Sequence, residues 1–430
     1  MNVLAVLKTF KGESMKKLLV LVVAVALFVP AMASAQIKWN GQLDILGYSL
    51  DKGMGSSGGA FAGHGTSNTY SRVILGASFD LAENIEGNAS LMYFSTWGDN
   101  YLAGQQADNT NDTGLLSSTR IIEANVVFKN LFDNDKISAK IGRQSYDGGT
   151  FFKVGPRDFV YSYLIIGLTK MSYPEMFTDG GMDGVVATYD NKEDLKVDLG
   201  YSKIINENTS AGVKINTTFV NANYKINDMW KVQGYLYDSE YAEGSDYLRF
   251  EVLGAKPEFT LGSFVGSLEL AQVFGDDDGS MFSTRRTADG YFAKLDASYD
   301  MNPFKVRGMY FMTGSEFMIP YTQNIYAGLY FTSMFRMMSG GGFFAEADSM
   351  DCLNFGADYT INKFKFALDY YRVGDRDDAN KVYEADFVAQ YNYKENVNFK
   401  GGIAYIGQES DGSSTEMIYV LSAGYKFGGK

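Results

Sequence analysis

Hydrophobic and polar residues alternate along most of this chain. From Ile37 to Ile45 the odd positions are apolar or glycine and the even positions are polar, and the stretches 70–81 and 291–299 repeat the pattern. A period of two is typical of a β-strand whose two faces meet different surroundings. Counting every such stretch predicts 18 strands. They cover residues 37–47, 70–81, 88–97, 117–129, 136–145, 183–189, 195–204, 216–225, 230–237, 247–258, 263–273, 291–299, 304–313, 350–359, 364–371, 384–393, 397–405 and 417–427.

The connections between the predicted strands alternate between short and long. Those after even-numbered strands are tight, such as 226–229, 301–303 and 394–396, whereas those after odd-numbered strands are mostly longer, such as 51–69 and 314–349. An even strand number with short periplasmic turns and long extracellular loops is typical of a bacterial outer-membrane barrel. We therefore predict an all-β fold, a transmembrane antiparallel β-barrel of about 18 strands. Counts of 16 or 20 are the alternatives.

A soluble β-sandwich or β-helix would show the same alternation, so the composition of the apolar face must distinguish a soluble fold from a membrane barrel. Charged residues make up 21% of the chain, yet only Arg143 and Lys256 fall at apolar positions of the predicted strands. A charge at the bilayer midplane costs about 2–4 kcal/mol, whereas a soluble surface imposes no such cost. Aromatic residues beside the short turns are typical of a girdle at the membrane interface. These are Phe79, Phe128, Tyr189, Tyr224, Trp230, Phe259, Tyr299, Phe304, Tyr359, Phe364, Tyr393 and Phe399.

The one long apolar run, residues 18–32, follows Lys16 and Lys17 and precedes a small-residue stretch that ends at Ala35. This layout predicts a cleaved signal peptide with an upstream extension, residues 1–35, and a single barrel domain over 36–430. A buried core helix is the alternative. Cleavage would change the formal net charge from −13 to −16.

The composition argues against several other classes. An acidic balance of 51 Asp and Glu to 38 Lys and Arg disfavours nucleic-acid binding. One Cys and one His exclude an internal disulfide framework and multi-histidine metal sites. His64 lies in a glycine-rich segment without a Ser or Asp constellation, Cys352 fits a packing role, and 276–279 lacks calcium-loop spacing. We expect no enzyme, no cofactor and no metal.

Two parts of the chain resemble Gram-negative outer-membrane porins. The segment 424–427 looks like the terminal aromatic signal of such proteins, although three further residues follow it. The segment 140–146 and the return through 182–185 are similar to the 18-stranded alginate-export-type porins, in which a Gly-Arg-Gln strand end precedes a pore-constricting third loop.

The resemblance implies an outer-membrane porin with a water-filled channel for passive diffusion of small hydrophilic solutes or ions, with an anion or saccharide preference. The alternative is a barrel scaffold for an electron-transfer or surface-layer partner. Expected partners are outer-membrane lipid, lipopolysaccharide and small hydrophilic solutes. A homotrimer is among the predicted partners, and no nucleic acid is expected.

Function in such a barrel depends on what lines the channel. The polar positions of the strands place basic residues in the lumen, many of them near the periplasmic mouth, and rings of basic side chains select anions. Cross-strand pairing, as of Asp358 with Lys365, is the alternative because it would cancel the field. The predicted lining residues are Lys38, Arg72, Lys196, Lys225, Lys231, Arg249, Lys305, Arg307 and Lys365.

Two long loops carry further predictions. Loop 146–182 includes an apolar stretch, so we expect it to fold inward and narrow the pore; a lid or subunit contact is the alternative. The predicted constriction residues are Arg143, Lys153, Arg157, Glu123 and Lys140. Loop 314–349 fits a capping helix, a partner contact or an additional hairpin. Inward aromatic residues are expected to pack under the loops or to stack on sugars; they are Phe94, Tyr235, Tyr237, Phe292, Phe311 and Tyr371.

Overall fold

The structure is a computed structural model, and it describes most of the chain from Ile37 onward. The described residues are 37–51, 67–97, 117–154, 181–205, 214–243, 246–277, 290–314, 318–319, 345–346, 349–375, 381–408 and 416–428. The predicted signal peptide, His64, Arg157 and most of loop 314–349 lie outside these ranges.

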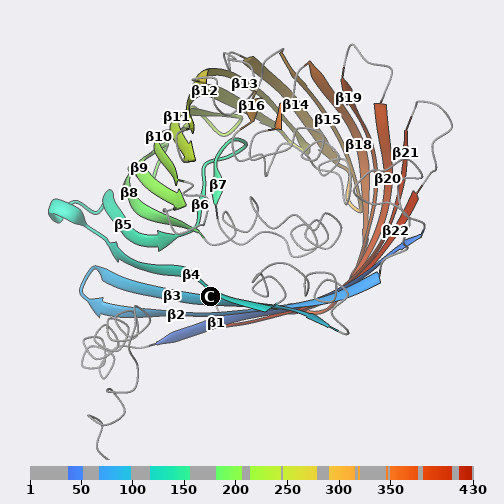
Figure 1. The fold of residues 1–430 in the computed structure, drawn as a ribbon, viewed down its shortest axis with the longest axis horizontal. Coiled ribbons are helices and arrows are strands. Elements are labelled where there is room, and N and C mark those ends of the chain that lie inside the picture. Colours follow the sequence, from blue (N-terminus) through green and yellow to red (C-terminus); the bar gives the residue numbers. More distant parts are fainter. Residues whose placement is uncertain are drawn as a thin grey trace, which may run out of the picture.

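Eighteen strands form one closed antiparallel barrel, which confirms the predicted fold and strand number (Figure 1). Each strand pairs with the next strand of the barrel along the chain, and the last strand pairs with the first. The barrel strands are β1 Lys38–Asp51, β2 Ser67–Ala82, β3 Ile85–Trp97, β4 Ser117–Phe128, β5 Ile137–Gln144, β8 Met182–Asp190, β9 Leu195–Ile205, β10 Lys214–Lys225, β11 Trp230–Glu243, β12 Asp246–Leu261, β13 Phe264–Asp277, β14 Gly290–Asp300, β15 Phe304–Thr313, β18 Met350–Ile361, β19 Phe364–Asp375, β20 Lys381–Lys394, β21 Val397–Gln408 and β22 Glu416–Gly428.

The alternation seen in the sequence becomes two chemically different faces. Large apolar side chains point away from the barrel, and Leu253 and Leu421 expose 54% and 69% of their surface. Because a closed barrel leaves no strand edge unpaired, this apolar outer band suits a lipid bilayer. Aromatic rings also meet near the short turns: Trp230 lies 4.9 Å from Phe259 between ring centroids.

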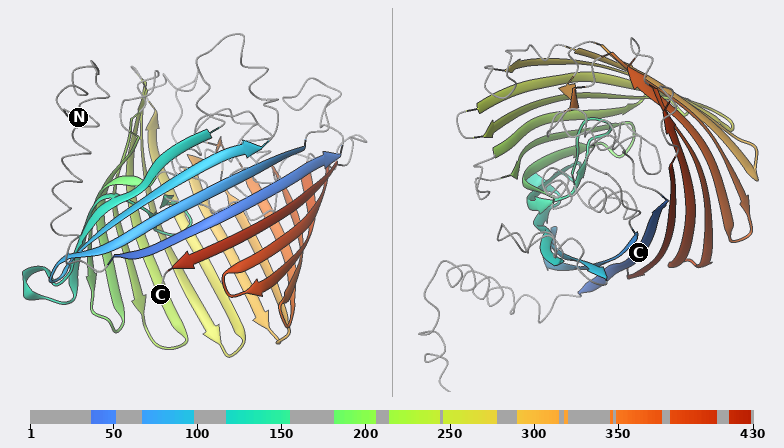
Figure 2. Two further views of the ribbon diagram at one scale, coloured as in Figure 1. Left: turned by 90° about the horizontal axis from the view of Figure 1, so that it is seen from below. Right: turned by 45° about the vertical axis from the view of Figure 1, so that its right-hand side comes forward.

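The short turns lie together at one end of the barrel (Figure 2). Several contain only two residues, as at 262–263 and 362–363. The longest of these short turns, 129–136, carries the 3-10 helix η1 Leu131–Asp133. This end corresponds to the periplasmic side of an outer-membrane barrel. Within the described residues, no helix is long and apolar enough to cross a membrane.

Two small hairpins stand apart from the barrel sheet. One pairs β6 Tyr146–Asp147 with β7 Lys153–Val154, and the other pairs β16 Met318–Ile319 with β17 Ala345–Glu346. The β6–β7 hairpin lies inside the ring of strands (Figure 1). It joins a buried apolar cluster that contains side chains of the inner wall from β8 to β19.

Candidate functional site in the barrel lumen

The inner wall of the barrel is polar and carries buried ion pairs. Arg72 lies against Asp44 of the neighbouring strand, and its Nη2 donates to Oδ2 at 2.8 Å. Both residues are buried. Further round the wall, Arg307 pairs with two carboxylates, those of Asp358 and Asp369. Arg72 and Arg307 both face the lumen, as predicted, but acidic neighbours compensate their charge.

Two predicted lysines are also paired. Lys365 lies 3.8 Å from Asp358, from Nζ to Oδ2, so the predicted cross-strand pair is present. Lys196 lies 3.5 Å from Asp198, which is buried. The pairing alternative therefore describes these parts of the wall better than an uninterrupted ring of positive charge.

The positive charge of other lysines is less fully compensated by acidic neighbours. Lys225 reaches Asp228 in the turn 226–229 at 2.6 Å, and this hydrogen bond holds the pKa of the Asp228 carboxyl below its ordinary value. Lys38, Lys231 and Lys305 form no ion pair within the described part of the chain. The short-turn mouth of the barrel thus carries positive charge that its described neighbours only partly cancel.

The β6–β7 hairpin packs on the inner wall through two phenylalanines of its turn. Phe151 and Phe152 expose 1% of their surface or less. Phe152 lies 5.1 Å from Phe219 and 5.4 Å from Tyr237, between ring centroids. Phe151 meets Phe292 edge to face at 5.1 Å. Such ring contacts add to the gain from burying the rings, so the hairpin is docked on the wall.

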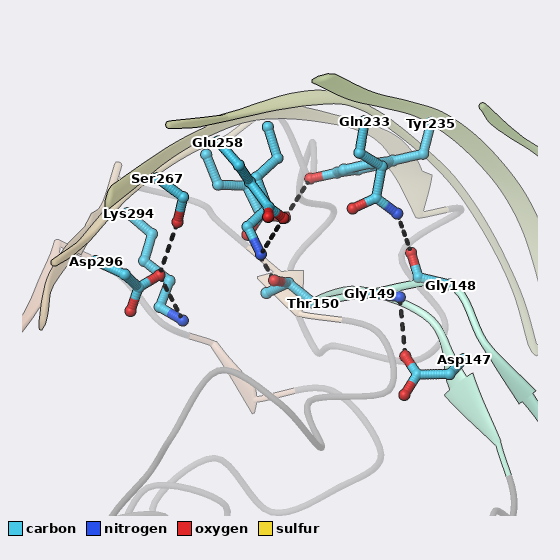
Figure 3. Close-up of polar contacts among 12 residues, drawn as sticks. Asp147, Gly148, Gly149, Thr150, Gln233, Tyr235, Glu258, Ser267, Lys294 and Asp296 are labelled. Carbon is cyan, nitrogen blue, oxygen red and sulfur yellow. Dashed lines mark hydrogen bonds and ion pairs between the residues drawn. The ribbon is translucent and has the colours of Figure 1, made fainter. Parts of the chain in front are cut away.

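The polar backbone of the same turn is anchored at one carbonyl group. The oxygen of Gly148 accepts hydrogen bonds from Asn221 at 3.1 Å and from Tyr237 at 2.6 Å. It accepts a third from Gln233 at 3.0 Å (Figure 3). These donors belong to β10 and β11. A carbonyl oxygen with three donors fixes the position of the turn on these two strands.

A buried carboxylate provides a second anchor. Thr150 donates from Oγ1 to Oε2 of Glu269 at 2.5 Å, and Tyr235 donates to Oε1 at 2.8 Å. Glu269 exposes only 1% of its surface, so both hydrogen bonds lie away from water. Hydrogen bonds to a buried charge are stronger than neutral ones at the surface. Residues 146–152 are thus held across β10 to β14.

Comparison with known proteins rests on structure alone. No protein-family model matches the chain, and no curated protein matches it in sequence. Similar solved structures include Acinetobacter baumannii OccAB2, with a TM-score of 0.59 and 13% identity over 92% of this chain and 98% of that one. OccAB1 of the same organism gives 0.58 and 12% over 91% and 97%. Pseudomonas aeruginosa OpdK with vanillate gives 0.56 and 11% over 91% and 99%.

Each of these solved structures is matched over almost its whole length. The chain shares their barrel fold. At such low identity the likeness covers the architecture, and the chemistry of the lumen must be argued from this chain's own residues.

In this barrel, two of the predicted constriction residues face the lumen. Glu123 accepts a hydrogen bond from Ser90 at 3.2 Å. Lys140 lies on the inner face of β5, in register with the buried Val186. The side chains of Lys153 and Arg157 lie outside the described part of the structure. A constriction built from the whole of loop 146–182 stays a prediction.

The prediction for Arg143 is wrong. Its side chain lies on the outer face with the exposed Ile141, and it forms two hydrogen bonds with Asp183, at 2.8 and 2.5 Å. The alternation predicts that Arg143 lies on the apolar face, whereas the resemblance to a Gly-Arg-Gln strand end predicts that it lies at the constriction. The preceding Gly142, with φ of +117°, brings this strand end close to β4 without changing the face of Arg143.

The faces predicted for β12 are also wrong. Arg249 is not a lumen-lining residue: it lies on the outer face and pairs with Asp238 and Glu251. Conversely, Lys256 points into the lumen and lies 3.7 Å from Glu258. Apolar residues occur at both parities in this strand, because its inner face lies against the docked hairpin, whose aromatic rings require apolar neighbours.

The sequence located the inward aromatic residues but not the anchors. Tyr235, Tyr237 and Phe292 are buried and pack on the hairpin, as the packing interpretation predicts. The roles of the Gly148 carbonyl and of Glu269 depend on contacts between segments that are far apart in the sequence. No sequence motif indicates such contacts. Among the described residues, no group of three or more His, Cys, Asp and Glu side chains could hold a metal ion.

Proposed function

We propose that this chain is an outer-membrane porin that forms a water-filled channel for the passive diffusion of small hydrophilic solutes or ions. The observation that carries the proposal is a closed 18-stranded barrel with an apolar outer band and a polar, ion-paired inner wall. Barrels of 16 to 18 strands are wide enough to enclose an aqueous channel. OpdK, a protein of the same fold, has been solved with vanillate.

A passive channel is better supported than the alternatives. A scaffold for an electron-transfer or surface-layer partner would need free space in the lumen, and the β6–β7 hairpin of this chain occupies part of that space. We further propose that the protein is not an enzyme, since its buried carboxylates serve as partners for basic or hydroxyl groups of the wall. Contacts with lipopolysaccharide and assembly as a homotrimer stay predictions.

An anion preference is the finer part of the proposal. Lys38, Lys231 and Lys305 supply positive charge that no ion pair with the described residues compensates. A saccharide preference has less support, because the inward rings of Tyr237 and Phe292 are buried against the hairpin rather than free to stack on sugars.

Planar-bilayer recording of the purified full chain tests both parts. We expect discrete open-channel conductance in KCl and, under a KCl gradient, a reversal potential that indicates anion preference. The same preparation unfolded before addition serves as the control. A folded protein without conductance would remove the porin proposal, and a cation-selective reversal potential would remove the anion preference alone.

A further inference from the structure

Among the described barrel strands, β4 and β5 share the shortest ladder. β4 pairs with β3 along its whole length, from Ser117 to Phe128, but its pairing with β5 runs only from Ala124 to Phe128. From residue 117 to 123, no described strand lies on the other side of β4. At this level β5 ends at Gln144, and the chain turns inward to the β6–β7 hairpin (Figure 1). A strand edge without a neighbour presents backbone donors and acceptors that need partners.

Arg143 bridges this gap with its side chain. Its Nη1 donates to the backbone oxygen of Ile121, on the open edge of β4, at 3.3 Å. Its Nε and Nη2 donate to the carboxylate of Asp183, on β8, at 2.8 and 2.5 Å. The guanidinium group carries five N–H donors in a fixed, planar fork, so one side chain can contact both strands at once. Arg143 therefore links β8 to the part of β4 that β5 does not reach.

The residues around Arg143 strengthen the same junction. Gly142 has a φ of +117°, and a Cβ at this position would lie 2.3 Å from a backbone oxygen of β4. The buried Asn125 of β4 donates from its amide to the backbone oxygen of Arg143 at 2.9 Å. The amide of Gln144 donates to the backbone oxygen of Gly184, on β8, at 3.3 Å. Side chains thus replace ladder hydrogen bonds where β5 leaves the wall.

This junction lies at the root of the β6–β7 hairpin. Gln144, the last residue of β5, is two residues before Tyr146, which packs against the buried apolar cluster of the hairpin. Asp183 directly follows Met182, which is fully buried in the same cluster. Gln144 and Met182 occupy opposite positions in the register of β5 and β8. The contacts of Arg143 therefore hold the end of β5 and the start of β8 together, beside the place where the hairpin begins.

We propose that Arg143 is a positioning residue of the channel: it fixes the root of the β6–β7 hairpin by tying β8 to the open edge of β4, and so sets the width of the pore beside the hairpin. The proposal rests on the proposed function, because pore width matters only in a conducting channel. Arg143 and Asp183 expose 38% and 49% of their side chains on the outer face. Exposed ion pairs contribute little to global stability, so the barrel should stay folded without this one.

The variant Arg143→Met tests this role in the full chain, because it removes all the donors and keeps an unbranched side chain. We expect a noisier single-channel current, since the root of the hairpin is no longer held. Hydrogen–deuterium exchange of the detergent-solubilised protein should become faster in residues 146–152, where the amide of Gly148 donates to the backbone oxygen of Phe152 at 2.7 Å. The exchange rate there should rise by about tenfold, as expected when one hydrogen bond to a charged group is lost.

The conservative variant Arg143→Lys separates the bridge from the ion pair. Lysine keeps the positive charge beside Asp183, but its compact ammonium group cannot reproduce the fork that also reaches Ile121. We therefore expect Arg143→Lys to leave the current noisy and the exchange of residues 146–152 fast. Full recovery of both by lysine would overturn the proposed link to β4.

Arg249→Met is the matched control. Arg249 also lies on the outer face and pairs with Asp238 and Glu251, at 2.9 and 3.2 Å, but the ladder of β11 and β12 continues past it on both sides. This variant should leave the current noise and the exchange of residues 146–152 unchanged. An equal effect in Arg249→Met would overturn the proposal.

A purely structural role of Arg143 has a different signature. Faster exchange confined to residues 121–128, with unchanged current noise and unchanged exchange in 146–152, would mean that Arg143 only stabilises the strand edge, and would overturn the proposal. Faster exchange in every strand would do the same, because the barrel itself would then depend on Arg143. An original chain without conductance would remove the proposed function, whereas the exchange of residues 146–152 would still decide whether Arg143 holds the hairpin.

Discussion

At the scale of single residues, the buried pair of Arg72 and Asp44 should be one of the most sensitive points of the barrel. Replacing one partner of a buried ion pair leaves the other charge in a poorly solvated site, at a cost of about 3–5 kcal/mol. We therefore expect Arg72→Met to lower the free energy of unfolding by that amount, measured by urea titration of the protein folded in lipid vesicles.

The exposed pair of Lys129 and Glu86 provides the control, since its atoms lie 2.8 Å apart, as close as those of the buried pair. Surface pairs contribute about 0–1 kcal/mol. Lys129→Met should therefore change the unfolding free energy by no more than this. Similar losses in both variants would mean that water reaches Arg72 as freely as Lys129.

The same residues show how far single positions follow from sequence. Alternation was enough to assign Arg72 and Arg307 to the lumen, because one parity of a strand faces one side. It was not enough to assign most of their partners, since Asp44 and Asp369 become neighbours only through the register of adjacent strands. Where both parities contain apolar residues, as around Arg249, the rule fails even for the face.

At the scale of elements, the β6–β7 hairpin is the part of the lumen that function should depend on most. Replacing both Phe151 and Phe152 with alanine removes the rings that fill the wall, at about 3–5 kcal/mol for each. The strand ladder of the barrel does not include these residues. We therefore expect the hairpin to undock while the barrel stays folded, with a larger and noisier single-channel conductance.

Phe132→Ala is the matched control, because this ring is 88% exposed in the turn 129–136. It should leave the conductance as it is. Unchanged conductance in the double variant would show that the hairpin does not limit the open pore. The length and apolar content of this loop predict an inward segment. They do not predict its anchors, because Gly148 is held by side chains that lie 73 to 89 residues away in the sequence.

At the scale of the whole molecule, the two faces of the barrel should tolerate charge very differently. Leu270 lies on the outer face of β13 with 51% of its surface exposed. On a soluble protein, a charged substitution at such an exposed position would usually change stability by about 0.5 kcal/mol or less. On a lipid-facing wall, arginine near the midplane costs about 2–4 kcal/mol.

We therefore expect Leu270→Arg to lower the free energy of unfolding from lipid vesicles by about 2–4 kcal/mol. The control is Asn40→Arg, an equally charged change on the exposed lumenal face of β1, which should have little effect because the channel is wet. The difference between the two variants, measured by the same urea titration, reports which face meets lipid. Equal tolerance at both positions would contradict a membrane-spanning barrel, since only a bilayer makes the outer face more costly to charge than the inner one.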